Sequence, residues 1–496
     1  MAGKRKVVLG ADAGTHGVRI LALRLPDCAV IAQSASGYSR RLAAGVQELE
    51  ARDLEQAFFT ALEALELPPD TVAAGLGVTH QRGTMIPVDS DCRPLAPAFC
   101  DSDERAADAQ GYRACGVDPA AYYRRSGCPV VSFNGFSKIL WCRQNRPELW
   151  RQAAAWLSPQ DYLLSRLSGR LQLSEGSALR SGFLDIHRRE VWRDLLPGAP
   201  FLELDCTAVG TACGTAAPDW AERYPVLRGA LLFAVPGDQP AAFLGSGAGG
   251  GAMAMNLGTT FVASAASSCP PDDPTALITT EVLPLGRYAP EFGTGAGGQF
   301  LDFLTGLLLG SVPDSAEQWA RLDAEAAAVP AGAQGLQIVP LLWQATSAGV
   351  EGRITGFRPF HTRGHFFRAA YEGLAWEARM SLEKLAAACG ARPEALRVFG
   401  GLSGCPGFLQ ILASVTGIPV EASGQRQASA FGAGLTCALG LGILTDADAL
   451  RAAAGAPGCI RYPKREEQAY YEQRFQTYRA CRQAIAPELP GRAFRA

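Results

Sequence analysis

The first residues that could do chemistry form a short polar turn near the N-terminus. In VVLGADAGTHGVRILALRL, the residues Asp12, Gly14 and Thr15 lie between two apolar runs, and Arg19 follows. A glycine allows the backbone to approach a phosphate, and successive N–H groups can point inward around it. Asp12 would supply the hard oxygen that Mg²⁺ prefers, and Arg19 could neutralise phosphate charge. An ordinary Asp-Gly hairpin turn without a ligand is the alternative interpretation.

A similar arrangement recurs near the middle of the chain. Apolar residues lead to the segment Asn256-Leu257-Gly258-Thr259-Thr260, and a further apolar run follows. The two Gly-Thr pairs lie about half a chain length apart, so a duplicated strand–turn–strand unit, one per domain, is one explanation. Coincidence is the other. If the unit is duplicated, the two loops could hold one phosphate chain from both sides.

A third candidate is Asp238, which follows the apolar run LLFAV, Pro236 and Gly237. A carboxylate at the end of a buried strand, beside a glycine that admits substrate, suits a general base. A hydroxyl that attacks a phosphoryl group gains from a carboxylate that accepts its proton. The alternative is a helix N-cap, which would contribute about 1 kcal/mol to stability.

Other patterns indicate less. The two GxGxxG matches, at 245–250 and 293–298, lack the strand-then-helix context of a dinucleotide site, and no P-loop is present. His361 and His365 have helical spacing but no evident third ligand, so we expect no metal site there. No GxSxG nucleophile elbow occurs.

The elements that must position these residues alternate between strands and helices. VAAGLGVTHQ and RVFGGLSG are typical of strands that end in polar or glycine-rich turns, whereas DLEQAFFTALEALE and HFFRAAYEGLAWEARMSLEKLAAACG have helical spacing. This alternation predicts an α/β architecture. Because no low-complexity linker separates the two halves, we expect two domains that face each other across a deep cleft, not two domains joined by a flexible linker.

Composition narrows the class of protein. A chain of 496 residues predicts two or three domains. Its 46 Lys+Arg and 48 Asp+Glu give a net charge of −2, which argues against binding to nucleic acid or to an anionic membrane. The 14 cysteines show no CxxC spacing, and no signal-peptide pattern opens the chain, so we expect reduced thiols and a cytoplasmic location. No apolar run approaches the ~20 residues of a membrane span.

In their order along the chain, the motifs resemble those of the FGGY family of carbohydrate kinases, in the actin-like ATPase superfamily. The likeness runs from about Val7 to Ile443. GADAGTHGVRI resembles the family's first phosphate loop, VPGDQPAA the segment with the catalytic Asp, and MNLGTTF the second phosphate loop. FGGLSGCPGFLQILASVTGIPV resembles the adenosine loop and helix, and SAFGAGLTCALGLG resembles the terminal helix.

The resemblance implies an α/β fold of two actin-like (ribonuclease H-like) domains that flank a deep catalytic cleft. Residues 1–236 would bind mainly the sugar and residues 237–485 mainly ATP. ATP and Mg²⁺ are the implied cofactors, a small sugar or polyol is the implied partner, and a homodimer is one expectation for the assembly. Asp238 would be the general base, and Asp12 and Asp238 would serve Mg²⁺. The residues implied for cofactor binding are Asp12, Gly14, Thr15, His16, Arg19, Gly258, Thr259, Thr260, Gly400, Gly401 and Ser403.

The sugar-side motifs are mixed. His80-Gln81-Arg82 resembles the NQRE segment of glycerol kinases, but Gly83 stands where those enzymes have a substrate-binding Glu, and Phe133 replaces a Tyr that contacts glycerol. Asp101 stands where many members have Trp, and a carboxylate there could bind a longer polyol or simply face solvent. The residues implied for substrate binding are His80, Gln81, Arg82, Asp101, Asp103, Phe133, Asp238 and Gln239.

These features favour ATP-dependent phosphorylation of a ketopentose such as xylulose or ribulose. Glycerol or another short polyol is the second candidate substrate. A non-catalytic sugar or nucleotide sensor of the same fold is the third hypothesis, because several motifs depart from the family pattern. His16 replaces the usual Ser or Thr of the first loop, and Trp343–Gly349 replaces a GERxP-like segment.

Overall fold

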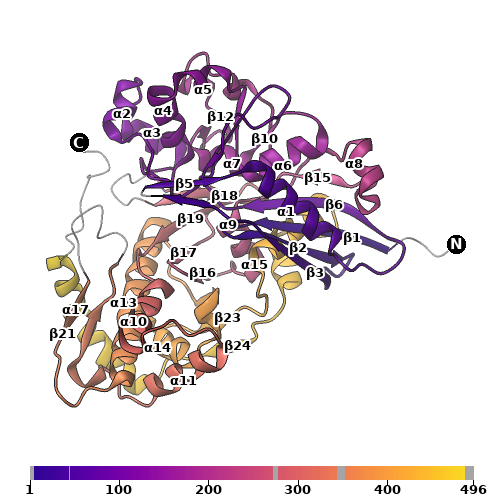
Figure 1. Cartoon of the computed structure of the whole chain (residues 1–496). Helices are drawn as coiled ribbons and strands as arrows, with labels where there is room; N and C mark the ends of the chain where they lie inside the picture. The colour runs from indigo at the N-terminus through magenta and orange to yellow at the C-terminus, as the bar shows by residue number, and fades with distance from the viewer. Residues whose placement is uncertain (1–4, 44, 272–277, 343–351, 486–496) are drawn as a thin grey trace.

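Two mixed β-sheets form the framework of the molecule in a computed structural model, which describes residues 5–43, 45–271, 278–342 and 352–485 (Figure 1). The segment 343–349 therefore lies outside the described residues. The first sheet has the strand order β14-β15-β6-β1-β2-β3. Its strands are β1 (Arg5–Ala13), β2 (Gly17–Arg24), β3 (Val30–Gly37), β6 (Thr71–His80), β14 (Ala212–Thr215) and β15 (Leu231–Phe233).

The second sheet has the order β18-β19-β17-β16-β22-β23-β24. The chain passes from the first sheet to the second between β15 and β16, and the domain limits 1–236 and 237–485 stay a prediction. The strands are β16 (Ala252–Leu257), β17 (Phe261–Ser264), β18 (Thr279–Val282), β19 (Tyr288–Gly293), β22 (Ala395–Phe399), β23 (Val420–Ala422) and β24 (Cys459–Arg461).

The two sheets repeat one topology. In the first, β1 is antiparallel to β2 and parallel to β6, and β2 is antiparallel to β3. In the second, β16 is antiparallel to β17 and parallel to β22, and β17 is antiparallel to β19. The outer strands continue the match, because β15 is parallel to β6 as β23 is to β22. This repetition favours duplication over coincidence, and the α/β architecture expected from the sequence is confirmed.

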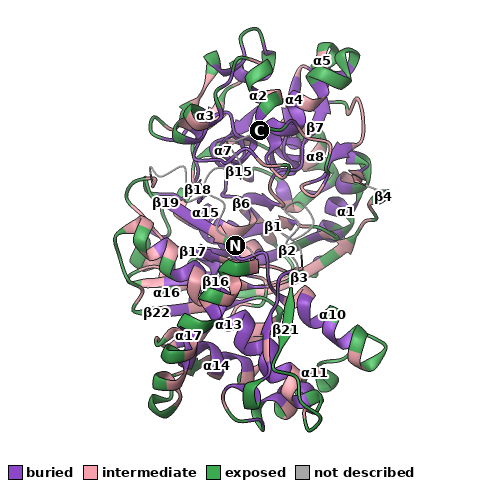
Figure 2. Ribbon diagram, turned by 90° about the vertical axis from the view of Figure 1, so that its left-hand side faces the viewer, coloured by how far each residue is buried: buried purple, intermediate pink, exposed green. Residues whose placement is uncertain are grey.

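Helices cover and connect the sheets, and the burial pattern follows this arrangement (Figure 2). Their apolar faces supply most of the core beside strands whose central residues are fully buried. The longer helices are α1 (Ala51–Glu63), α4 (Gly135–Asn145), α6 (Pro159–Ser168), α9 (Asp238–Ser246), α10 (Gly298–Leu309), α11 (Ala316–Ala327), α13 (Arg363–Cys389), α14 (Pro406–Thr416), α15 (Ala428–Gly440) and α17 (Arg465–Ile485).

Helices α9 and α15 pack closely between the two sheets. A Cβ atom on Gly432 of α15 would overlap the carbonyl oxygen of Ala241 in α9, and one on Gly10 of β1 would overlap that of Ala430. The small residues of SAFGAGL are therefore required by close backbone approach, which agrees with the small-residue pattern of that segment. This packing fixes the start of α9, where Asp238 lies, against β1 of the first sheet.

The hairpin of β18 and β19 belongs to the second sheet but packs against the first half. The Tyr123 hydroxyl donates to the Ile278 carbonyl at 2.7 Å, and the Thr280 N–H donates to the Gly127 carbonyl at 3.0 Å. From the other side, the Tyr288 hydroxyl donates to the Ile186 carbonyl at 3.1 Å. The hairpin thereby carries acidic residues of the second half into the half that is expected to bind sugar.

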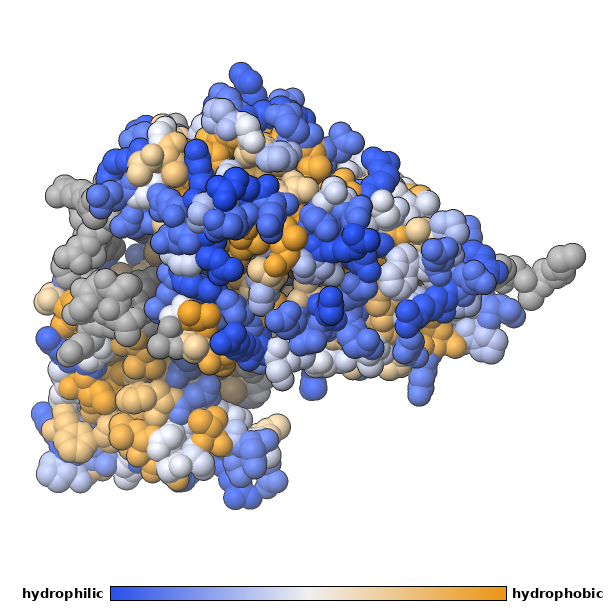
Figure 3. All heavy atoms as spheres, turned by 45° about the horizontal axis from the view of Figure 1, so that its top comes forward, coloured by the Kyte–Doolittle hydropathy of each residue, from blue (hydrophilic) through white to orange (hydrophobic). Residues whose placement is uncertain are grey.

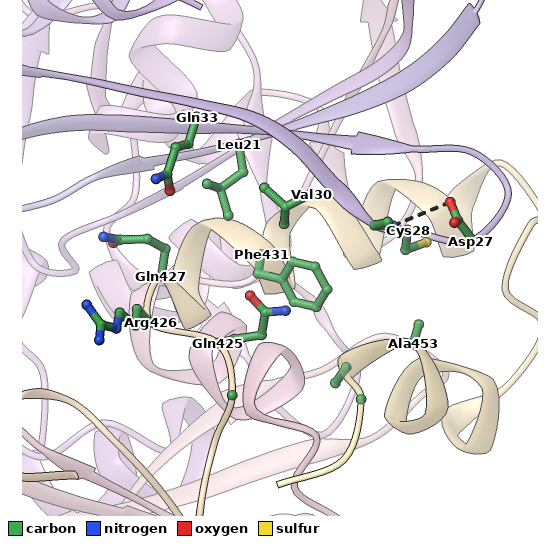
Figure 4. A pocket seen from close by; sticks show the side chains of 14 residues that line it. Leu21, Asp27, Cys28, Val30, Gln33, Gln425, Arg426, Gln427, Phe431 and Ala453 are labelled. Atoms are coloured by element: carbon green, nitrogen blue, oxygen red, sulfur yellow. Dashed lines mark hydrogen bonds between the residues drawn. The ribbon is translucent and has the colours of Figure 1, made fainter. Parts of the chain in front are cut away.

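A cavity of about 510 Å³ lies where β2 and β3 face the segment before α15 (Figure 4). Leu21, Val30 and Gln33 line it from the first half, and Gln425 and Phe431 line it from the second. None of the predicted catalytic or phosphate-binding residues is part of this lining.

The surface differs between the two halves. Most of the exposed large apolar side chains, Phe303, Leu307 and Phe357 among them, belong to the C-terminal half, and apolar residues gather at the lower left of Figure 3. Within the described residues, no helix is long and apolar enough to cross a bilayer.

Candidate active site

Asp12 lies at the end of β1, beside Thr79 of β6 and Arg19 of β2 in the strand register. The turn after it is closed by the Gly14 N–H, which donates to the Gly17 carbonyl at 3.0 Å. The Tyr38 hydroxyl donates to the Gly14 carbonyl and fixes the loop from the side. The tip itself, Thr15 and His16, is exposed, as a ligand-binding loop requires.

The Asp12 carboxyl is poised for a cation. Its Oδ1 is buried and has no hydrogen-bond partner among the described residues. Burial, and then repulsion by Asp238, raises the pKa of Asp12 to about 7, while Arg19 opposes the shift. Within the described part of the chain, no group of three or more His, Cys, Asp and Glu forms a complete metal cage. An unpartnered Asp12 oxygen with a second carboxylate near enough to repel it does fit Mg²⁺, which normally keeps several waters and phosphate oxygens among its ligands.

Asp238 opens α9 directly after Gly237. Its Oδ1 accepts the Gln239 N–H at 2.9 Å and the Arg82 Nε–H at 2.7 Å. Among the described residues no donor reaches Oδ2, and the side chain is 26% exposed. One carboxylate oxygen is thus held in place while the other remains available to a substrate hydroxyl.

The segment His80-Gln81-Arg82 begins with the last residue of β6. The Gln81 N–H donates to the Ala13 carbonyl at 2.9 Å, so this segment is tied to the end of β1. The Arg82 side chain then runs over Gly237, where a Cβ would come within 2.5 Å of its methylene carbons. Glycine at 237 is therefore needed for Arg82 to reach Asp238.

Arg82 also contacts two glutamates that the sequence did not predict. Its Nη1 donates to Glu291 at 2.8 Å and to Glu281, both on the β18–β19 hairpin. The only local signal for these glutamates is that each of the strands TTEV and YAPEFG contains an acidic residue. A charged residue inside a buried strand is unusual and indicates a partner of opposite charge.

His80 plays a different part from its neighbours. It is fully buried, and its Nδ1 lies 3.3 Å from the amide nitrogen of Gln160. Burial, together with the positive charge of Arg82, lowers the pKa of His80 to about 3. A neutral imidazole in this place supports the strand end and the Gln160 contact, and it carries no charge to a substrate.

The remaining sugar-side residues form two supported loops. The Lys138 ammonium is buried and donates to the carbonyl oxygens of Asp101 at 3.0 Å and of Ser132 at 2.8 Å. The Asp101 carboxylate accepts from Arg40 at 3.3 Å. Lys138 therefore joins the loop of Asp101 to that of Phe133, although it was absent from the predicted site.

Gly83 and Phe133 lie against each other. Gly83 has φ +79°, and a Cβ there would overlap the Phe133 carbonyl oxygen. A glutamate at this position is incompatible with the backbone, so the departure from the glycerol-kinase pattern is built into the loop. The Phe133 ring lies 5.0 Å from the Arg180 guanidinium carbon, which is a cation–π distance.

Asp103 is fully buried, and its carboxylate accepts from Arg105 at 2.7 Å and from the Gln47 N–H at 3.0 Å. These bonds hold the Asp103 side chain within its loop, and its role in substrate binding stays a prediction.

The second loop, Gly258–Thr260, joins β16 to β17. Its backbone is held by the Gly298 N–H, which donates to the Gly258 carbonyl at 2.9 Å, while Thr259 is exposed. Asn256, at the strand end, donates to the Gln239 side chain at 3.2 Å and links this loop to α9. The predicted catalytic aspartate and both predicted phosphate loops thus meet at the start of α9.

The glycine-rich turn after β22 lies next to this loop. Gly400 has φ +93°, and a Cβ there would come within 2.6 Å of Asn256 Oδ1. A Cβ on Gly401 would meet nothing within 4 Å, so the turn borders open space. The Ser403 hydroxyl donates to the Gly400 carbonyl at 2.6 Å and holds the turn from within.

Comparison with known proteins covers nearly the whole chain. Residues 7–198 match the N-terminal domain, and residues 253–441 the C-terminal domain, of the FGGY family of carbohydrate kinases. An L-fuculokinase of Salmonella typhi is 27% identical over 463 residues, covering 90% of this chain and 95% of its own. A xylulose kinase of Streptomyces rubiginosus is 26% identical and covers 90% of both chains. The crystal structure of a xylulose kinase from Rhodospirillum rubrum, 25% identical, superposes with a TM-score of 0.86 over 97% of this chain and 99% of its own. The predicted two-domain actin-like fold is confirmed.

Proposed function

Because the chain belongs to the FGGY family of carbohydrate kinases, which transfer phosphoryl groups to sugar hydroxyls, we propose that it phosphorylates a ketopentose such as xylulose or ribulose with ATP. The observation that carries the proposal is the meeting of Asp238, Arg82 and Asp12 at the start of α9, between two glycine loops of matching topology.

Asp238 acts as the general base in this proposal. Its Oδ2 takes the proton of the attacking hydroxyl, while Oδ1 remains bound to Arg82 and to the Gln239 N–H. Because the attacking and leaving oxygens of phosphoryl transfer lie roughly in line, orientation of this hydroxyl is a main contribution of the protein.

The two loops hold the phosphate chain. Gly14, Thr15 and the exposed Arg19 approach from the first half, and Gly258 and Thr259 approach from the second. Adenosine lies over Gly400 and Gly401, and open space is available beside Gly401. Mg²⁺, held by Asp12 and Asp238 through oxygen ligands or water, would neutralise charge on the phosphates.

Two observations favour a ketose over glycerol. Gly83 and Phe133 remove two polar groups that the glycerol-kinase pattern places around glycerol, and the backbone at Gly83 leaves no room to restore one. The relatives with the highest similarity reported above are named for L-fuculose and xylulose phosphorylation. Arg82, which the chain shares with the glycerol-kinase pattern, keeps glycerol and short polyols as the second candidates.

A coupled assay of ADP release over pentuloses, tetruloses, heptuloses, polyols and glycerol tests the proposal. We expect sugar-dependent ADP release with the highest kcat/KM for a ketopentose. Highest kcat/KM for glycerol would support the second candidate. ATP binding without stimulation by any sugar, together with sugar-dependent thermal stabilisation, would instead identify a sensor and contradict the proposal.

A further inference from the structure

Three carboxylates surround the guanidinium of Arg82. Its Nε donates to Asp238 at 2.7 Å, and its Nη1 donates to Glu291 at 2.8 Å and to Glu281. The two glutamate side chains are only 4% and 1% exposed. They lie on adjacent antiparallel strands, where Glu281 is paired with Ala289 and Glu291 with Thr279.

These contacts fix the direction of the third nitrogen. A guanidinium is a planar fork, so holding Nε and Nη1 also fixes Nη2. Among the described residues, none accepts a hydrogen bond from Arg82 Nη2. This nitrogen is also not completely buried. Nη2 is therefore the one nitrogen of this guanidinium that no carboxylate of the described residues holds.

A second guanidinium extends the cluster. Arg180 Nη1 lies 3.8 Å from Glu281, and its guanidinium carbon lies 5.0 Å from the ring of Phe133. With Asp238, the cluster holds three carboxylates and two guanidiniums, and His80 and Cys128 lie near enough to interact with Arg82 electrostatically. Burial, with repulsion by Glu281 as a further cause, raises the pKa of Glu291 to about 7.

Stability of the fold alone does not account for this cluster. Desolvation of buried ions costs several kcal/mol each, and a well-packed apolar group of similar volume is often at least as stabilising. Direct contact with a substrate does not account for the two glutamates either, because both side chains are almost fully buried. What the glutamates do control is the place of Arg82, which in turn contacts the proposed base.

We infer that Glu281 and Glu291 are positioning residues: they hold Nη1 of Arg82 so that Nη2 faces a substrate oxygen while Nε holds Asp238. The inference rests on the proposed function and deepens it. Two glutamates of the second half hold an arginine of the first half in the position from which it binds the sugar.

Glu281→Gln and Glu291→Gln test the inference, since each keeps the side-chain shape and removes one charge. We expect the KM for the sugar to rise about tenfold or more, because small displacements of a positioning group can cost up to ~100-fold. The KM for ATP should not change. Glu372→Gln is the matched control: Glu372 is equally buried and binds Arg368 at 2.8 Å in α13, outside the proposed site. It should lower the thermal midpoint without changing the KM for the sugar.

A double-mutant cycle separates positioning from an independent effect. In an Arg82→Lys background, Glu281→Gln should change kcat/KM by less than threefold, because contacting residues that act through one another are not additive. Equal fold-changes in the wild-type and Arg82→Lys backgrounds would overturn the inference. So would an unchanged KM for the sugar in both glutamine variants.

A readout without turnover keeps the inference separate from the proposed function. In a crystal structure of Glu291→Gln, the Arg82 guanidinium should move away from Asp238, and an unmoved guanidinium would overturn the inference. If the wild-type enzyme phosphorylates no sugar, the proposed function fails, whatever the position of Arg82. If Glu291→Gln does not fold, the same structure of Glu281→Gln decides.

Discussion

The two halves of the molecule share one strand topology but carry different residue types at equivalent positions. Asp12 and Asn256 each lie two residues before the glycine of their loop. On the neighbouring parallel strands, Thr79 is paired with Asp12, and Phe399 with Asn256. The first of these strands continues into the polar segment His80-Gln81-Arg82, whereas the second continues into Gly400-Gly401. One half therefore presents charged side chains, and the other presents backbone and open space.

This difference suits the two unlike ligands that we propose for the two halves. Hydroxyl groups of a sugar need side-chain donors and acceptors at fixed positions, since a buried polar group without a partner costs free energy. A phosphate chain and a planar base are held well by backbone N–H groups and by surfaces without side chains. Helix α9 begins at Asp238, the proposed base, at the boundary between the two.

The largest effect is expected where the two halves meet. Asp238→Asn should lower kcat by about 10²–10⁴-fold, because general base catalysis contributes about that much. Binding of ATP and sugar, followed by isothermal calorimetry, should change little. A kcat within threefold of the wild-type value would remove Asp238 as the base.

Asp12→Asn makes the first loop resemble the second and should lower kcat about 100-fold or more, because a transition-state charge contact is lost. Its effect on stability should have the opposite sign. The pKa of Asp12 rises from 3.8 to about 7 on folding, so the native state loses stability as pH rises between these values, and the loss is complete above about 7.

Asparagine mimics the protonated carboxyl and avoids this loss. Without nucleotide, Asp12→Asn should therefore melt about 2–5 °C above the wild type at pH 8, with the difference vanishing near pH 4. Differential scanning calorimetry across pH measures this. A lower midpoint for the variant at pH 8 would contradict the account.

The reciprocal Asn256→Asp should raise the KM for ATP and leave the KM for the sugar unchanged.

A smaller effect on activity is expected when a side chain is added to the glycine-rich turn after β22. Gly400→Ala combines a left-handed backbone with a Cβ 2.6 Å from Asn256 Oδ1, so it should cost about 1–3 kcal/mol and raise the KM for ATP. Gly404→Ala is the matched control, because a Cβ there meets nothing within 4 Å. Steady-state kinetics compares them, and equal ATP KM values for both variants would show that the turn does not shape the nucleotide site.

The smallest effect on activity is expected at Asp103. Asp103→Asn removes a charge that holds Arg105 and should lower the thermal midpoint by a few degrees, consistent with about 1–3 kcal/mol for a weakened buried hydrogen bond. The KM for the sugar should stay within threefold of the wild-type value. A larger change would return Asp103 to the substrate site.

The loops and Asp238 could be predicted because their signals are local. A glycine-bounded turn after an apolar strand is visible within ten residues: Gly14 and Gly258 lie in such turns, and Asp238 opens α9 directly after one. The contacts of Arg82 with Glu281 and Glu291 join residues 199 and 209 positions apart, and no local pattern specifies such pairing. His80 and Asp103 are a different case: both are buried among contacts within the protein, and a local pattern does not reveal that burial.

Gly83 shows what a local pattern leaves open. The sequence shows that the side chain expected from the glycerol-kinase pattern is missing, but only the backbone shows that φ is +79° and that the Phe133 carbonyl fills the space. The missing group is therefore a property of the loop, and replacing Gly83 by Glu would not restore glycerol binding.

Direct observation of phosphoryl transfer tests the central claim most simply. Phosphorus-31 NMR of the enzyme with ATP and a ketopentose should show a phosphomonoester growing in step with ADP, only when the sugar is present. The same mixture with Asp238→Asn should show almost none. Inorganic phosphate in place of the ester, or no ATP consumption with any sugar that binds, would contradict the account.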